Sequence, residues 1–94
     1  MTVSKFIDRA GHPVELVLYM FASCPYCQKV LRHAEELGFN LQQRDIRLDK
    51  TAWATLLREG GKTTVPCLFI DGKAMYESAD IMRYLSNDVR RVEG

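Results

Sequence analysis

An apolar run at residues 14–21, followed at once by a change of periodicity, is the feature of this chain that most limits its fold. The run is broken only by Glu15, which is typical of a central strand buried on both faces of a sheet. From Cys27 onward, apolar residues recur at i, i+3, i+4 and i+7, the spacing of a helix that packs one face against a core. A strand that leads directly into such a helix predicts an α/β domain.

The rest of the chain continues this alternation of strands and helices. Periodicity and turn residues predict a weak strand at 39–48, a helix at 51–59, strands at 65–70 and 73–76, and a last helix with Ser78 as its N-cap. The Asp-Gly turn between the last two strands joins them as an antiparallel hairpin. The order β-α-β-α-β-β-α then gives a mixed four-stranded sheet flanked by three helices.

The chain of 94 residues is long enough for one domain with a thin core. We divide it into an unassigned N-terminal extension (1–12), a folded domain (13–86) and a polar C-terminal tail (87–94) that we expect to be frayed. In the second helix, Trp53 is expected to act as a core anchor on the same apolar face as Leu56 and Leu57.

Charge and hydropathy exclude several classes of function. The net charge of +1, with basic and acidic residues interspersed, does not suggest a nucleic-acid-binding protein. The longest apolar run is well short of the ~20 residues that cross a bilayer, and the first residues do not resemble a signal peptide. We therefore expect a cytoplasmic monomer with neither nucleic acid nor membrane as a partner.

Cys24 and Cys27 lie on either side of Pro25 and Tyr26, one helical turn apart. This spacing should place their Cα atoms within the ~4.4 to 6.8 Å that a disulfide requires. Three cysteines do not suit a secreted disulfide scaffold, and a Cys-X-X-Cys pair in a reducing compartment binds metal or is redox-active. A disulfide that closes so short a loop adds little stability and is easily reduced, which favours a redox role.

The position of Cys24 just before a helix favours an ionised sulfur. Unpaired backbone N–H groups at a helix start stabilise negative charge, but the helix terminus alone contributes only about 0.3 to 2 kcal/mol. Direct hydrogen bonds from the N–H groups of Tyr26 and Cys27, and from the Cys27 thiol, are expected to supply the rest. We expect the sulfur to be exposed at this helix start.

A metal site is the competing explanation for the cysteine pair. Structural zinc needs four ligands, whereas the other candidates, Cys67, His12 and His33, show no ligand spacing, so we expect no metal. Cys67 lies within a predicted buried strand and is expected to be an inert core residue.

Three motifs together resemble the glutaredoxin family over about residues 14–86. They are Ser23-Cys24-Pro25-Tyr26-Cys27 after a strand, Thr63-Thr64-Val65-Pro66 before another, and Phe69-Ile70-Asp71-Gly72 in the hairpin. The resemblance implies a thioredoxin-like fold, a cis peptide bond at Pro66, and glutathione as reductant and co-substrate. It also implies that Cys24 is the nucleophile and Cys27 the resolving residue. Glutathione would then contact Tyr26, Lys62, Thr64, Val65, Pro66, Glu77 and Ser78.

Two departures from the family pattern bear on the ligand. Many glutaredoxins have a lysine where this chain has Phe21, so one positive charge near the thiol is missing, and Lys62 is the candidate that would replace it at the glycyl carboxylate. The segment around Glu77-Ser78 is more similar to that of the N-terminal domain of glutathione transferases. There Ser78, at a helix start, suits the γ-glutamyl carboxylate.

The sequence therefore predicts a glutathione-dependent thiol-disulfide oxidoreductase. Its substrates would be glutathione mixed disulfides and disulfide-bonded proteins, attacked by Cys24. Two alternatives stay open at this point. One is a thioredoxin-type electron donor served by a flavoprotein reductase, and the other is an iron-sulfur module that uses Cys24 and glutathione as cluster ligands.

Overall fold

The computed structural model describes residues 5–92. Its elements in chain order are β1 (Phe6–Asp8), β2 (Pro13–Val14), β3 (Leu16–Met20), α1 (Pro25–Glu36), β4 (Gln42–Asp45), α2 (Lys50–Gly60), β5 (Cys67–Ile70), β6 (Lys73–Met75), α3 (Ser78–Asn87) and β7 (Val89–Arg91).

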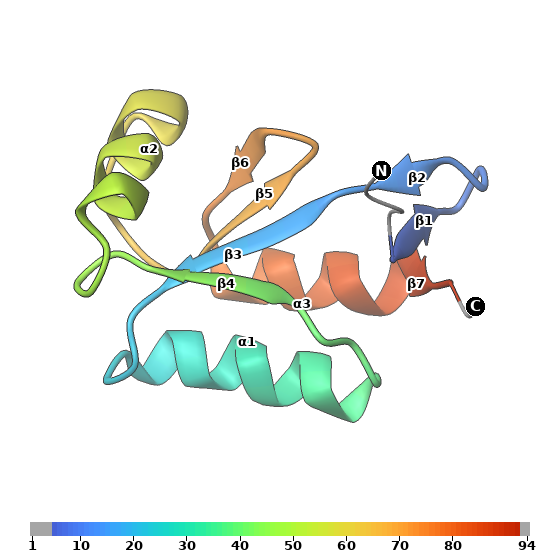
Figure 1. Ribbon diagram of the computed structural model, residues 1–94. Coiled ribbons are helices and arrows are strands. Elements are labelled where there is room, and N and C mark those ends of the chain that lie inside the picture. Colours follow the sequence, from blue (N-terminus) through green and yellow to red (C-terminus); the bar gives the residue numbers. More distant parts are fainter. Residues whose placement is uncertain (1–4, 93–94) are drawn as a thin grey trace.

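The main sheet has four strands in the order β4-β3-β5-β6. The central strand β3 pairs in parallel with β4 and antiparallel with β5, and β5 and β6 form the hairpin. Helices α1 and α3 cover one face of this sheet and α2 covers part of the other, as Figure 1 shows. The predicted fold class, a mixed four-stranded sheet with three helices, is confirmed.

Side chains of β3 and β5 alternate between two cores. Leu18 and its partner Leu68 are fully buried on the side of α1 and α3. Tyr19 and Cys67, one residue away on each strand, belong to a smaller core beneath α2. Because successive side chains of a strand point to opposite faces, the apolar run of residues 14–21 supplies both cores at once.

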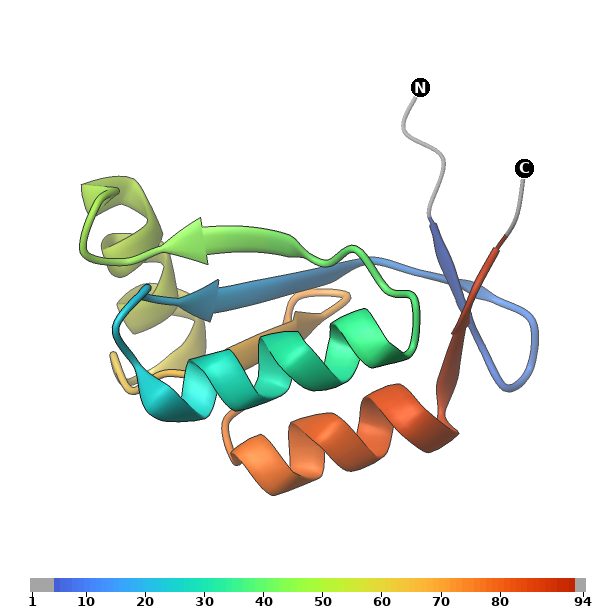
Figure 2. The ribbon, with the colours of Figure 1, turned by 90° about the horizontal axis from the view of Figure 1, so that it is seen from below.

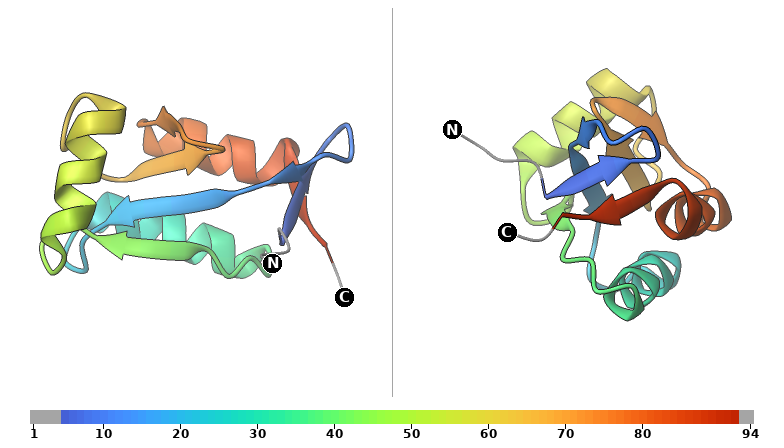
Figure 3. Two further views of the ribbon diagram at one scale, coloured as in Figure 1. Left: turned by 45° about the horizontal axis from the view of Figure 1, so that its top comes forward. Right: turned by 90° about the vertical axis from the view of Figure 1, so that its right-hand side faces the viewer.

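A second, three-stranded sheet was not predicted. It has the order β2-β1-β7, and β1 pairs antiparallel with β7. The prediction of a frayed tail is therefore wrong for residues 89–91, where Val89 is buried. Residues 1–4 of the extension and 93–94 of the tail lie outside the described residues. In Figure 3, β1 and β7 lie side by side at the end of the molecule from which both chain ends leave.

Helix α3 begins one residue earlier than predicted. Its N-cap is Glu77, which makes no side-chain capping hydrogen bond, and Ser78 is the first residue of the helix. The expectation that Ser78 is the N-cap is wrong. Helix α2, by contrast, is capped by Asp49, whose carboxylate accepts the N–H groups of Thr51 and Ala52, and it ends at Gly61 in the left-handed conformation with φ 89°.

Helix α2 turns a different face to the sheet than predicted. Ala52 and Leu56, four residues apart, are fully buried, whereas Trp53 is 46% and Leu57 43% exposed. Neither Trp53 nor Leu57 is a core anchor. The reason is geometric, because each lies one residue, about 100° of helix, beyond a buried position. None of the helices within residues 5–92 is long and apolar enough to cross a membrane.

Candidate active site

The loop between β3 and α1 places Cys24 at the start of the helix. Cys24 is the N-cap of α1 in an extended conformation, with φ −80° and ψ 116°, and Pro25 is the first helical residue. The N–H of Cys27 donates to the Cys24 Sγ atom at 3.3 Å. Proline fits this position because its missing N–H is not needed in the first turn. The sulfur therefore receives one of the backbone hydrogen bonds that the sequence led us to expect.

The side chain of Cys24 is more buried than predicted. Cys24 is 5% exposed and Cys27 is 0% exposed. Phe21 on the preceding loop and Val65 on the segment before β5 pack against the core cluster that contains both cysteines. The expectation of an exposed sulfur is therefore wrong, because Cys24 belongs to the buried core.

Cys27 is held in its neutral form. Burial raises the pKa of its thiol to about 12, and a hydrogen bond with Cys24 acts in the same direction. A neutral thiol is a hydrogen-bond donor, so Cys27 offers its backbone N–H and its S–H to the same sulfur. Cys27 is therefore the member of the pair that stays protonated at neutral pH.

The segment before β5 lies against this sulfur. The Val65-Pro66 peptide bond is cis, as the resemblance implied. The Val65 carbonyl oxygen lies 4.0 Å from the Cys24 Sγ atom, so the thiol can donate weakly to it. Pro66 is buried, Val65 half-buried and Thr64 exposed. Figure 2 shows this segment beside the start of α1, where the two loops form one end of the molecule.

Lys62 is tied to Tyr76, a residue that the sequence analysis did not single out. The Tyr76 hydroxyl donates to the Lys62 carbonyl oxygen at 2.8 Å, and the Lys62 Nζ atom lies 4.4 Å from the centre of the Tyr76 ring. A Cβ atom at Gly60 would collide with the same hydroxyl. Tyr76 therefore fastens the end of α2 and the segment that follows it to the hairpin.

The remaining predicted ligand residues lie at the starts of α1 and α3, and within the described residues no hydrogen bond joins their side chains to the Cys24 Sγ atom. Tyr26, in the first turn of α1, is 59% exposed. Glu77 is exposed and Ser78 half-buried at the start of α3. Among residues 5–92, the hydrogen bonds of the Cys24 Sγ atom join it to Cys27 and Val65. These three residues form the centre of the candidate site.

Arg47 is a second residue that the sequence analysis missed. Its guanidinium group lies 3.6 Å from the centre of the Phe21 ring, and its Nη1 atom donates to the Ser23 hydroxyl at 3.3 Å. Phe21 stands where many glutaredoxins have a lysine. In this chain the Arg47 guanidinium group, from the turn between β4 and α2, lies over the ring of Phe21. The single sequence offers no signal for this contact, because 26 positions separate the two residues.

Cys67 is fully buried beneath α2, as an inert core residue should be. Burial raises the pKa of its thiol from an ordinary value of 9.0 to about 11, although a hydrogen bond with Tyr76 partly opposes the effect. The native state keeps this proton between pH 9 and 11, where the unfolded chain has lost it. The stabilisation is therefore complete below pH 9 and is lost as the pH rises toward 11.

A Cys67→Ala variant tests this linkage. Near pH 10.5, Cys67 alone should lower the free energy of unfolding by about 2 kcal/mol relative to pH 8. Urea unfolding gives the free energy of unfolding at both pH values. Its decrease from pH 8 to pH 10.5 should be smaller in the variant than in the unmodified chain by about this amount. Equal losses in the two proteins would contradict the assignment.

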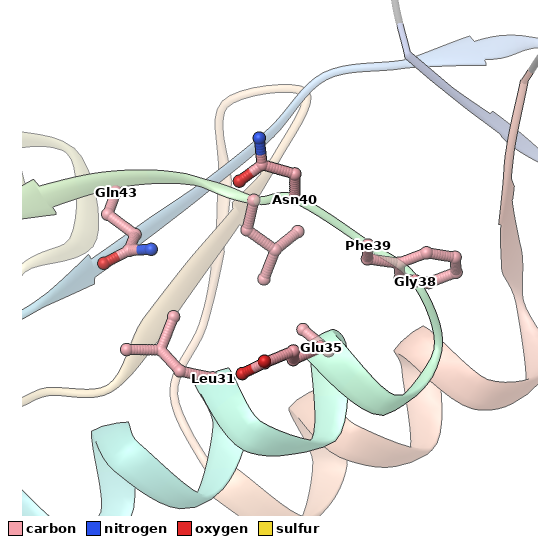
Figure 4. A pocket seen from close by; sticks show the side chains of 8 residues that line it. Leu31, Glu35, Gly38, Phe39, Asn40 and Gln43 are labelled. Carbon is pink, nitrogen blue, oxygen red and sulfur yellow. The ribbon is translucent and has the colours of Figure 1, made fainter.

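One pocket formed by the described residues lies away from Cys24. It has a volume of about 360 Å³ and lies between the second half of α1 and the start of β4 (Figure 4). Its lining residues are Leu31, Ala34, Glu35, Gly38, Phe39, Asn40, Leu41 and Gln43. None of the predicted site residues lines it. Within residues 5–92, no three histidine, cysteine or acidic side chains are grouped so that they could hold a metal ion.

The fold and the Cys24 site define a thioredoxin-like domain, in which a Cys-X-X-Cys pair at a helix start faces a cis-proline segment. Residues 18–91 match the family described as glutathione S-transferase, N-terminal domain. The chain belongs to this family. No curated protein matches it.

Solved structures agree with the family assignment. A rice glutathione S-transferase in complex with glutathione is 29% identical, with a TM-score of 0.65 over 78% of this chain and 32% of that one. A buckwheat glutaredoxin-glutathione complex is 28% identical, with a TM-score of 0.63 over 76% and 67%. A thioredoxin-like protein at 22% identity, with a TM-score of 0.68 over 78% and 100%, supports the fold alone. This chain spans about a third of the rice transferase.

Proposed function

We propose that the protein is a glutathione-dependent thiol-disulfide oxidoreductase. The Cys24 thiolate attacks the glutathione sulfur of a mixed disulfide, so a bond forms between Cys24 and glutathione. The substrate sulfur leaves as a thiolate and takes up a proton. A second glutathione thiolate then attacks the Cys24-glutathione bond, which releases glutathione disulfide and restores the Cys24 thiolate.

The arrangement of Cys24 and Cys27 is the observation that carries this proposal. One sulfur lies at a helix start with a backbone N–H donor at 3.3 Å, and burial keeps the second thiol neutral beside it. Such a pair separates a nucleophile from a resolving group. When the target is an intact protein disulfide, Cys27 attacks the bond between Cys24 and the protein and leaves an internal disulfide for glutathione to reduce.

Family membership and the glutathione complexes of two relatives support glutathione as the ligand. In this proposal the backbone of Val65, next to Pro66, pairs with the peptide backbone of glutathione. The first N–H groups of α3, near Ser78, receive the γ-glutamyl carboxylate, since a helix start attracts an anion. Tyr26, Lys62, Thr64 and Glu77 border the same ligand.

The low exposure of Cys24 sets a condition on the proposal, because a disulfide must reach its sulfur in line with the breaking bond. The neighbours of Cys24 in the β3–α1 loop, Ser23 and Pro25, are exposed, and Val65 is half-buried. A small mixed disulfide has to bring only one sulfur atom into contact with Cys24. We therefore place the scissile bond at the surface, with the substrate outside the fold.

A coupled assay tests the proposed function. The chain is mixed with glutathione, glutathione reductase, NADPH and a small glutathione mixed disulfide, and NADPH oxidation is followed. We expect the rate to depend on the chain and on glutathione. Reduction by a flavoprotein thioredoxin reductase without any dependence on glutathione would indicate a thioredoxin-type donor instead. A brown dimer with visible absorbance after anaerobic purification would indicate the cluster-binding alternative.

A further inference from the structure

The turn between β4 and α2 holds Arg47 at the edge of the candidate site. Strands β3 and β4 run in parallel, so the turns that follow them meet at one end of the sheet, and the N–H of Ile46 donates to the Met20 carbonyl at 2.9 Å. Asp45 fixes the turn by accepting the N–H groups of Arg47 at 2.8 Å and Leu48 at 3.1 Å. In Figure 3 this turn lies beside the β3–α1 loop.

Two contacts then fix the guanidinium group of Arg47. One face of it covers the Phe21 ring at 3.6 Å, and its Nη1 atom donates to the Ser23 hydroxyl at 3.3 Å. Both partners lie within three positions of Cys24 in the sequence. A guanidinium carries five N–H donors in its own plane, so stacking leaves its edge free for other acceptors.

The charge of Arg47 has no acidic partner in the described part of the chain. The paired arginines in residues 5–92 are Arg9 with Asp88, Arg44 with Asp49, Arg58 with Glu59 and Arg83 with Asp80. Two acids lie two positions from Arg47 in sequence: the Oδ1 atom of Asp45 accepts backbone N–H groups of the turn, and Asp49 pairs with Arg44. The stack on a neutral ring holds a positive charge on the loop that carries Cys24 without neutralising it.

We propose that Arg47 binds a carboxylate of the thiol substrate and so selects carboxylate-bearing thiols and mixed disulfides at Cys24. The inference rests on the proposed function and adds a specificity residue to it. Arginine suits this role because its planar donors match the two oxygens of a carboxylate. Lys62 is less suited, because its contacts are with Tyr76 rather than with the loop that carries Cys24, and an ammonium group lacks the planar pair of donors.

The test compares two disulfides that differ in one charge. One is a small mixed disulfide of glutathione, and the other is the same compound with its glycyl carboxylate esterified. We expect the unmodified chain to prefer the acid by about tenfold in kcat/KM, mainly through KM. Arg47→Gln should lose this preference, Arg47→Lys should keep part of it, and added salt should weaken it in the unmodified chain.

Arg58→Gln is the matched control, because Arg58 is an exposed arginine on α2 that pairs with Glu59. This variant should keep the full preference. If Arg47→Gln slows both disulfides equally, Arg47 only supports the loop and the inference is overturned, while the proposed function stands. If the unmodified chain acts on both disulfides equally well, the inference is also overturned. If it acts on neither, the proposed function fails and the inference fails with it.

Discussion

The Cys24→Ser variant is expected to lose turnover of a glutathione mixed disulfide by about a thousandfold or more. A serine hydroxyl is not ionised at neutral pH, so the hydrogen bond from the Cys27 N–H at 3.3 Å has no anion to stabilise. Serine is nearly isosteric with cysteine, so it fits the place of Cys24, which is 5% exposed, and the fold should be retained. Turnover in the coupled assay and the far-UV circular dichroism spectrum check the two halves of this expectation.

Cys67→Ser is the matched control for this loss. It makes the same replacement of sulfur by oxygen at a cysteine that is fully buried in the core beneath α2, whereas Cys24 belongs to the core on the other face of the sheet. Activity per folded molecule should be unchanged in it. Alkylation with iodoacetamide, located by mass spectrometry, gives an independent reading, since Cys24 should react first. Full turnover without Cys24, or reaction at Cys27 before Cys24, would remove the assignment.

The Cys27→Ser variant is expected to separate the two classes of substrate. Reduction of an intact protein disulfide should fall by about a hundredfold or more, because no second thiol remains to resolve the bond between Cys24 and the protein. Turnover of the glutathione mixed disulfide should be retained within a few fold. The backbone N–H of residue 27, which donates to Cys24 Sγ, is present in the variant as well.

Measurement of both reactions on one preparation of Cys27→Ser gives the decisive ratio. A variant that loses both activities while it stays folded would show that the Cys27 thiol supports Cys24 directly, rather than only resolving its disulfide. A variant that keeps both activities would show that the protein uses the Cys24 route alone. In that case the resolving role would be withdrawn.

The elements that the sequence predicted well are those whose signal is local and strong. The apolar run of residues 14–21 and the helical spacing after Cys24 gave β3 and α1 because both faces of the strand and one face of the helix are buried. The small sheet was missed because β1, β2 and β7 have only two or three residues each. Pairing between segments so far apart leaves no periodic pattern in either one.

The features of the candidate site were likewise predicted only where their signal is local in the sequence. Cys24 and Cys27 could be placed at a helix start because they lie within one short motif. The burial of Cys24 and the position of Arg47 depend on separate loops that meet at one end of the sheet, and no spacing in the sequence encodes that meeting. The rotation of α2 that exposes Trp53 is likewise set by packing on β3 and β5, since two adjacent apolar residues leave the inward face ambiguous.

The pairing of β1 with β7 has a practical consequence. Phe6 lies opposite Arg91, so the described chain enters and leaves the fold at one place, and Figures 1 and 2 show that place at the end of the molecule opposite the β3–α1 loop. An affinity tag, a surface tether or a fused domain would therefore join the described fold, at residues 5 and 92, on the side opposite the cysteine pair. The protein can be anchored to an electrode or a bead with its β3–α1 loop on the side away from the attachment.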